Sequence, residues 1–148
     1  MGNLYSTKTD FAISRVALCH GKAHVRKVPK NYYLVDSNPT VHANLTADVY
    51  EAVGQFPNNS LDRVRFVYCN VSVLGNPHLY KWFKKVKIGG ILGIFGPNLK
   101  SRIYSDPNNP TYGPSAPLQT VIALAMKKSD TLYKVYQKTK FVKLVRVQ

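Results

Sequence analysis

The sequence has 148 residues, 45% of them hydrophobic, so it can bury the core of one domain and is too apolar to be disordered throughout. Its formal net charge of +14 favours an anionic partner, either a nucleic acid or an anionic membrane surface. No apolar run approaches the roughly 20 residues of a membrane-spanning helix, and two cysteines alone are too few ligands for a metal site.

The positive charge is concentrated in the second part of the chain. Residues 1–62 carry six Lys or Arg against five Asp or Glu, whereas residues 63–148 carry fifteen against two. A field of this kind attracts phosphates, although a charge that serves only solubility would produce the same count.

The chain begins with Met-Gly-Asn-Leu-Tyr-Ser, and residues 1–10 are predicted to form a flexible N-terminal segment. Gly2 followed by Ser6 and then Lys8 fits the pattern for N-myristoylation in a eukaryotic cell. A single myristoyl chain holds a membrane only marginally, but a basic surface supplies the second signal that a stable anchor needs.

Short apolar runs in the first part of the chain predict strands. Residues 13–19 form the first run and end at a His-Gly pair, and residues 32–35 form the second, which stops at an Asp-Ser-Asn-Pro turn. Residues 45–53 contain a short helix-like piece. Residues 64–73 are β-branched and aromatic and make the best strand candidate.

A helix is predicted over residues 77–86, because Leu79, Trp82, Phe83 and Val86 recur at spacings of three and four. Trp82 and Phe83 are interpreted as core anchors rather than as platforms for nucleobases. The Gly-Gly pair at 89–90 is expected to stop this helix, and a strand is predicted over residues 91–95.

The last third begins with a long loop or lid over residues 97–117, which hold five of the nine prolines. A helix over residues 118–126 and closing strands over residues 135–147 follow, and cations decorate those strands: Lys134, Lys138, Lys140, Lys143 and Arg146. Strands that alternate with helical pieces indicate one α/β domain over residues 11–148, with a mostly parallel sheet.

Cys19 and Cys69 both lie in apolar, strand-like runs. Buried free thiols behave as small hydrophobic groups, so both are predicted to be free in an intracellular, reducing compartment. A disulfide between them is the open alternative.

Residues 32–95 resemble the middle of a class I S-adenosylmethionine-dependent methyltransferase. Tyr-Leu-Val-Asp-Ser-Asn-Pro at 33–39 resembles the second strand of that family, and Ala-Asp at 47–48 resembles the acidic position after the third. Phe-Pro-Asn-Asn-Ser-Leu-Asp-Arg-Val at 56–64 resembles the entry to the fourth strand, and Val-Lys-Ile-Gly-Gly-Ile-Leu at 86–92 the entry to the fifth. The resemblance implies a Rossmann-like methyltransferase fold with flanking helices.

The resemblance also implies cofactor-binding residues. Asp36 would accept hydrogen bonds from the ribose hydroxyls of S-adenosylmethionine, Asp48 would lie near the adenine, and Gly21 would be the surviving glycine of the cofactor loop. The alternatives are a turn carboxylate, an acid at a helix N-terminus and an ordinary turn. Asn70 is a weak catalytic candidate, because the Asn/Asp-Pro-Pro-aromatic signature of amino-group methyltransferases is missing.

The first loop departs from the family pattern. It offers one glycine instead of Gly-x-Gly-x-Gly, and only about ten residues separate the first two strands, fewer than a parallel crossover usually needs. The first helix is therefore expected to be shortened or missing, which speaks against binding of S-adenosylmethionine.

Two functions follow. The first is a catalytically degenerate methyltransferase-like scaffold that binds a membrane or nucleic acid through its cations, Lys81, Lys84, Lys85 and Lys87 among them, although a solvated face is the plain alternative for these lysines. A structural protein of a large eukaryotic virus, bound to other virion proteins, would fit the size, the charge and the lipidation signal. The second is an active methyltransferase that acts on a nucleic acid or a protein.

Overall fold

A computed structural model describes residues 13–19, 31–69, 74, 79–105 and 115–148. Seven strands form one sheet: β1 (Arg15–Leu18), β2 (Tyr33–Asp36), β3 (Leu45–Thr46), β4 (Leu61–Val67), β5 (Val86–Phe95), β8 (Tyr133–Gln137) and β9 (Phe141–Arg146). The helices are α3 (Val49–Ala52), α5 (Leu79–Phe83) and α6 (Leu118–Ser129), with single 3₁₀ turns η2 (Pro39–Val41), η3 (Val53–Gln55) and η4 (Leu99–Ser101).

The strand order is β3-β2-β1-β4-β5-β9-β8. Strands β1 to β5 pair with one another in parallel, while β9 runs antiparallel to β5 and β8 antiparallel to β9. The chain therefore starts in the middle of the sheet, moves to the β3 edge and returns beside β1 as β4. This confirms the mostly parallel sheet, and it puts the reversal of strand order between β1 and β4.

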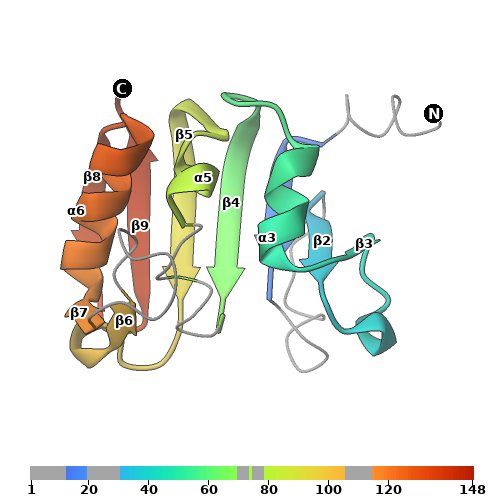
Figure 1. The fold of residues 1–148 in the computed structure, drawn as a ribbon, viewed down its shortest axis with the longest axis horizontal. Helices are drawn as coiled ribbons and strands as arrows, with labels where there is room; N and C mark the ends of the chain where they lie inside the picture. Colours follow the sequence, from blue (N-terminus) through green and yellow to red (C-terminus); the bar gives the residue numbers. More distant parts are fainter. Residues whose placement is uncertain (1–12, 20–30, 70–73, 75–78, 106–114) are drawn as a thin grey trace.

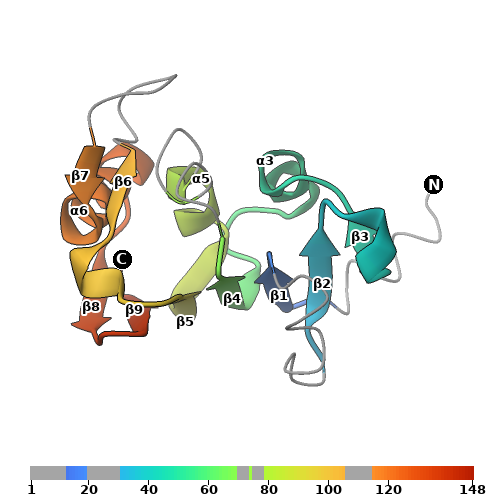
Figure 2. The ribbon, with the colours of Figure 1, turned by 90° about the horizontal axis from the view of Figure 1, so that it is seen from below.

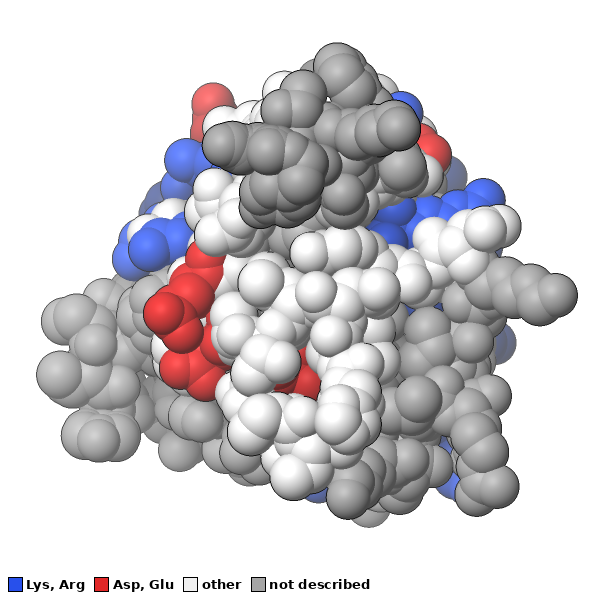
Figure 3. Space-filling view, turned by 90° about the vertical axis from the view of Figure 1, so that its right-hand side faces the viewer, with Lys and Arg blue, Asp and Glu red and all other residues white. Residues whose placement is uncertain are grey.

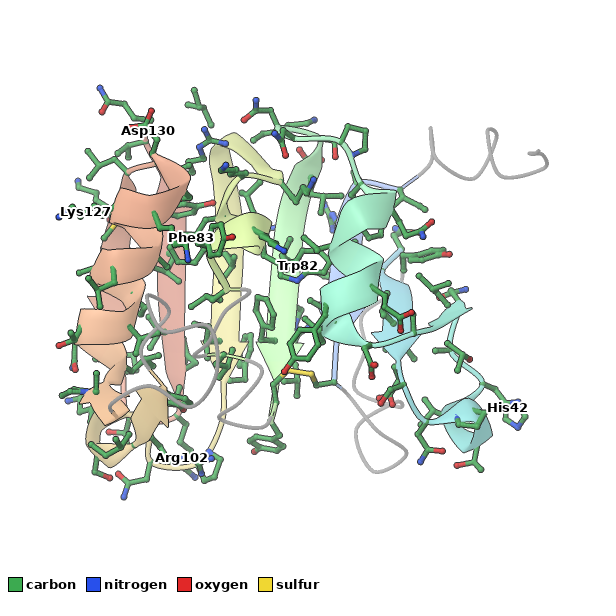
Figure 4. All side chains as sticks on the ribbon, in the orientation of Figure 1. His42, Trp82, Phe83, Arg102, Lys127 and Asp130 are labelled. Atoms are coloured by element: carbon green, nitrogen blue, oxygen red, sulfur yellow. A yellow bond between two sulfur atoms is a disulfide. The ribbon has the colours of Figure 1, made fainter. Side chains whose placement is uncertain are left out.

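Helices α3, α5 and α6 lie on the same side of the sheet (Figures 1 and 2). Trp82 and Phe83 of α5 are 0% exposed, and the Trp82 ring packs edge-on against Phe66 of β4, with 6.0 Å between ring centroids (Figure 4). Their predicted role as core anchors is confirmed. Helix α6 ends where Asp130 adopts a left-handed conformation, after Lys127 and Lys128 have placed positive charge at the negative end of the helix.

The other side of the sheet is covered differently. A small cluster of Ala17, Leu34 and Val41 packs there with Tyr32 and Ala43, at the β1–β2 end. In the described ranges no helix covers the rest of this side (Figure 2). The side chains of β4 reflect this difference between the two sides of the sheet. Val64 and Phe66 belong to the main core, whereas Arg63 and Arg65, which alternate with them, do not.

Cys19 and Cys69 form a disulfide, with Cα atoms 5.2 Å apart, so the prediction of free thiols is wrong. The two residues are 50 positions apart in sequence but follow neighbouring strands, since Leu18 of β1 pairs with Phe66 of β4. Left-handed conformations at Cys19 and Tyr68 turn the chain at both strand ends. The expected reducing compartment rested on free thiols and stays untested.

The sheet also departs from the predicted element boundaries. Helix α5 ends at Phe83, and strand β5 begins at Val86, which was predicted to be helical; β5 runs through Gly89 and Gly90, which were expected to stop that helix. A Cβ atom on Gly90 would lie 2.9 Å from the carbonyl oxygen of Asp62, so the glycine allows β4 to approach where its register shifts. Strand β4 covers residues 61–67 rather than 64–73.

The predicted loop over residues 97–117 contains regular structure. It includes η4 and the two-stranded pair of β6 (Ile103–Ser105) and β7 (Ser115–Pro117), in which Tyr104 is opposite Ala116. Among the described residues, no helix is long and apolar enough to cross a membrane.

Candidate functional site

The carboxyl ends of four parallel strands, β1, β2, β4 and β5, lie at the same end of the sheet, at the bottom of Figure 1. In open parallel sheets, ligands bind in the crevice outside the carboxyl ends of the strands, at the point where the strand order reverses. In this chain that point lies between β1 and β4, which makes it the first place to look for a site.

The Cys19–Cys69 disulfide lies at this crevice (yellow bond in Figure 4). Cys19 directly follows β1, and Cys69 is the second residue after β4. Cys69 is only 5% exposed. The bond therefore ties the two strand ends together and puts sulfur atoms where a polar ligand would need hydrogen-bonding groups.

Asp36 is the last residue of β2 and is partly exposed. Its Oδ1 accepts a hydrogen bond of 2.9 Å from the backbone N–H of Asn38, and the Asn38 side chain in turn accepts from Thr40 at the start of η2. Asp36 thus performs the local turn role that was the alternative to ribose binding. Its role toward a ribose stays a prediction.

Asp48 precedes α3 as its N-cap residue and is exposed. The Glu51 carboxylate accepts from the backbone N–H of Asp48 at 3.4 Å, as in a capping box. The helix N-terminal role is therefore present, and the adenine contact stays untested. Gly2, Gly21 and Asn70 lie outside the described residues.

A hollow of about 370 Å³ lies next to the crevice, at the carboxyl ends of β4 and β5. Its polar groups come from Tyr68, Arg102 and Tyr104. Burial raises the pKa of the Tyr104 phenol, and the nearby Arg102 guanidinium partly opposes this rise. Sequence reasoning missed the hollow because three separate elements contribute these residues, and Arg102 and Tyr104 lay in the expected loop.

The four predicted polyanion-binding lysines do not form one site. Lys81, Lys84 and Lys85 line a hollow of about 390 Å³ between α3 and α5, which Glu51 also lines. Burial lowers the pKa of Lys85, and the charge of Lys84 lowers it further. Lys87 lies apart, with its Nζ 3.0 Å from Oδ1 of Asp62.

A second group of cations lies on the side of the sheet that the described helices leave uncovered. Arg63 and Arg65 of β4 alternate with core residues, and the register places Lys143 of β9 opposite Gly93, the β5 neighbour of Arg65. Arg146 is different from the other cations of the closing strands, because it is only 9% exposed and its guanidinium donates to the carbonyl oxygen of Val86.

The acidic residues that the structure describes lie mainly toward the β3 end of the sheet. Figure 3 looks at the molecule from the β3 end and shows carboxylates gathered there, with cations to either side. Within the described ranges, no group of three or more His, Cys, Asp or Glu side chains is placed to hold a metal ion.

No protein-family model matches the chain, and no curated protein matches it significantly in sequence. Solved structures match it in fold. A protein from Corynebacterium glutamicum aligns with a TM-score of 0.59 and 11% identity, over 93% of this chain and 74% of that one. A SAM-dependent methyltransferase from Archaeoglobus fulgidus aligns with a TM-score of 0.54 and 12% identity, over 97% and 90% of the two chains.

A third match is the 16S rRNA (adenine(1408)-N(1))-methyltransferase from Catenulisporales acidiphilia. It has a TM-score of 0.50 and 13% identity, over 100% of this chain and 96% of that one. At such identities the likeness concerns the fold alone. The chain has the Rossmann-like fold of the class I S-adenosylmethionine-dependent methyltransferases, as the resemblance in sequence implied.

S-Adenosylmethionine is the cofactor that this fold implies, and the described part of the crevice does not fit it. The strand ends that flank the crevice are joined by a disulfide, and Oδ1 of Asp36 accepts a hydrogen bond from the backbone N–H of Asn38. We therefore derive no methyl-transfer step from these residues.

Proposed function

We propose that this protein is a methyltransferase-fold scaffold that transfers no methyl group and binds a polyanion, either a nucleic acid or an anionic membrane. The observation that carries the proposal is the Cys19–Cys69 disulfide across the crevice between β1 and β4. A cofactor with a charged methionine end needs polar groups and close backbone approach at this place. The disulfide offers neither.

Charge supports the second half of the proposal. Arg63, Lys134 and Lys143 are exposed on one side of the sheet, while Lys81 and Lys84 lie on the helix side. With fifteen cations against two acids after residue 62, most of this charge has no acidic neighbour in sequence to offset it. Phosphates of a nucleic acid or of lipid headgroups are the natural counter-charges.

Calorimetric titration of the purified protein with S-adenosylmethionine and with its demethylated product tests the first half. We expect no binding heat at millimolar cofactor. Micromolar binding that is lost in Asp36→Ala would overturn the proposal and restore an enzyme. Anisotropy with labelled oligonucleotides and co-sedimentation with anionic vesicles test the second half, and both binding constants should fall as salt is raised.

The second candidate function is an active S-adenosylmethionine-dependent methyltransferase acting on a nucleic acid or a protein. The hollow at the ends of β4 and β5 favours it, because Arg102 and Tyr104 could hold an acceptor group beside the crevice. If the titration detects the cofactor, transfer of labelled methyl groups to RNA, DNA and protein acceptors is the next measurement.

The membrane form of the proposal includes a myristoylated Gly2. The test expresses the full chain in a eukaryotic cell with and without Gly2→Ala. The wild type should be found in the membrane fraction, and Gly2→Ala should move the protein to the soluble fraction. Unchanged partitioning would remove the lipid anchor from the proposal and leave the cationic surface.

A further inference from the structure

The side of the sheet opposite α3, α5 and α6 carries both cations and aromatic rings. We call it the basic-aromatic face, and it consists of Arg63, Arg65, Phe95, Tyr136, Phe141 and Lys143. One row of the sheet register runs from Arg65 through Gly93 and Lys143 to Tyr136. It crosses from β4 to β8, which is about 14 Å at the usual spacing between strands.

Arg65 is held between two rings. Its guanidinium carbon lies 4.7 Å from the centroid of Phe95 and 5.6 Å from that of Tyr32. The Nε atom is buried and has no hydrogen-bond acceptor among the described residues. The two ring contacts orient the guanidinium, while the buried Nε donor without a partner carries a cost in free energy.

Gly93 leaves space for the Phe95 ring because it has no side chain. A Cβ atom on Gly93 would lie 2.9 Å from Cε1 of Phe95, so the ring lies against the backbone of β5 where only a glycine leaves room. Phe95 stacks on Phe141 with centroids 5.9 Å apart and an angle of 25° between the planes. The sheet thus presents rings lying along its surface rather than standing out from it.

The rings and cations are accessible to a ligand. Phe141 is 37% exposed and Tyr136 is 45% exposed, and Nζ of Lys143 lies 5.6 Å from the centroid of the Tyr136 ring. A hollow of about 250 Å³ lies among Tyr32, Arg63, Arg65 and Phe95. It has room for a planar ring, and two guanidinium groups border it.

From this arrangement we infer that the basic-aromatic face binds single-stranded nucleic acid. Bases stack on Phe141, Tyr136 and the rim of the hollow, while Arg63, Arg65 and Lys143 neutralise the phosphates between them. This inference rests on the proposed function, because it names the partner and the surface for polyanion binding.

Two other anionic partners fit the face less well. A duplex keeps the π-faces of its bases stacked internally, so the rings would have nothing to stack on. A membrane surface is bound by apolar side chains that insert below the headgroups, whereas here the Phe95 ring lies against the sheet and the cations surround a hollow.

The test compares variants that keep charge and apolarity but remove stacking. Arg65→Lys keeps the positive charge and loses the planar group, and Phe141→Leu keeps an apolar side chain and loses the ring. Lys127→Gln, in the last turn of α6 on the helix side, is the control for a changed cation elsewhere. Fluorescence anisotropy with a labelled single-stranded RNA of mixed sequence gives the binding constants, and circular dichroism confirms folding of each variant.

We expect Phe141→Leu and Arg65→Lys each to weaken binding roughly tenfold or more, the loss of about one stacked base. Lys127→Gln should change the binding constant less than threefold at the same salt concentration. Tyr136→Ala removes a second aromatic ring of the face. Because Tyr136 lies on the edge strand β8, a loss of binding in this variant reports on stacking rather than on a folding defect.

Four results would overturn the inference, and they differ in what they say about the proposed function. If the face variants bind RNA like the wild type while Lys81, Lys84 and Lys85 substitutions abolish binding, polyanion binding stands but occurs on the helix side. If only vesicles of anionic phospholipid bind, the membrane form stands alone. If neither RNA nor vesicles bind, both proposals fail. Equal affinity for a duplex of the same sequence would also contradict the single-stranded site.

Discussion

The disulfide between Cys19 and Cys69 should make a large contribution to the stability of the fold. It joins residues 50 positions apart, and the chain-entropy model assigns about 4 kcal/mol to a loop of that length. Domains of this size are commonly stable by about 5 to 15 kcal/mol, so the double variant Cys19→Ala, Cys69→Ala should lose a large fraction of the free energy of unfolding.

Equilibrium unfolding in urea measures this loss. The fluorescence of Trp82, the one tryptophan of the sequence, reports on the core because its side chain is fully buried. The midpoint should fall both in the double variant and in the wild type with reductant. The slope against urea should rise, since an unfolded chain without the cross-link exposes more surface. Reductant should have no effect on the double variant.

The reasoning fails if the double variant loses less than about 1 kcal/mol, because the model gives no value so small for this loop length. Mass spectrometry after alkylation provides an independent check. Denatured but unreduced wild-type protein should take up no alkylating agent, and labelling of both cysteines would show that the bond is absent.

Four further predictions concern the core and the surface. Tyr133→Phe removes the 2.6 Å hydrogen bond to the carbonyl oxygen of Phe83 and should cost about 1 to 2 kcal/mol in urea unfolding; a loss near zero would contradict a net contribution from that bond. Burial raises the pKa of the Tyr133 phenol, so the folded protein keeps this proton after the unfolded chain has lost it. Stability should therefore fall as pH rises above about 10, and less steeply in Tyr133→Phe; parallel curves for the two proteins would refute this assignment. Trp82→Ala should cost about 4 kcal/mol by circular dichroism, whereas a cost below about 2 would mean that the core collapses around the site. Lys87→Gln should change stability by less than about 1 kcal/mol, because Lys87 and Asp62 are both about half exposed, and a larger loss would show a coupled network.

Local patterns were sufficient to predict much of the fold. The strands at the start of the chain, helix α6 and the burial of Trp82 and Phe83 follow from hydrophobic periodicity, which acts within one element. The resemblance over residues 32–95 supplied the topology. Asp36 and Asp48 were placed at strand and helix ends as expected, although the structure gives them local roles.

Features that depend on contacts between distant segments were not predicted. The disulfide requires knowing that β1 and β4 are neighbours. The continuation of β5 through Gly89 and Gly90 depends on a close approach of β4, and glycine alone suggested a break. The basic-aromatic face was missed for the same reason. Arg63 and Arg65 can be recognised as part of a binding surface only once the fold shows that no described helix covers their side of the sheet.

Among the described residues, charge is separated along the sheet, so this part of the molecule has an electric dipole. Asp36, Asp48 and Glu51 lie toward the β3 end (Figure 3), whereas Lys134 and Lys143 lie on the strands of the other end. In the field of a polyanion, the dipole of the described residues favours an approach in which β8 and β9 face the polyanion and Asp36, Asp48 and Glu51 point away. Encounters would then be oriented as well as frequent, and the association rate constant should fall with ionic strength more steeply than the dissociation rate constant rises.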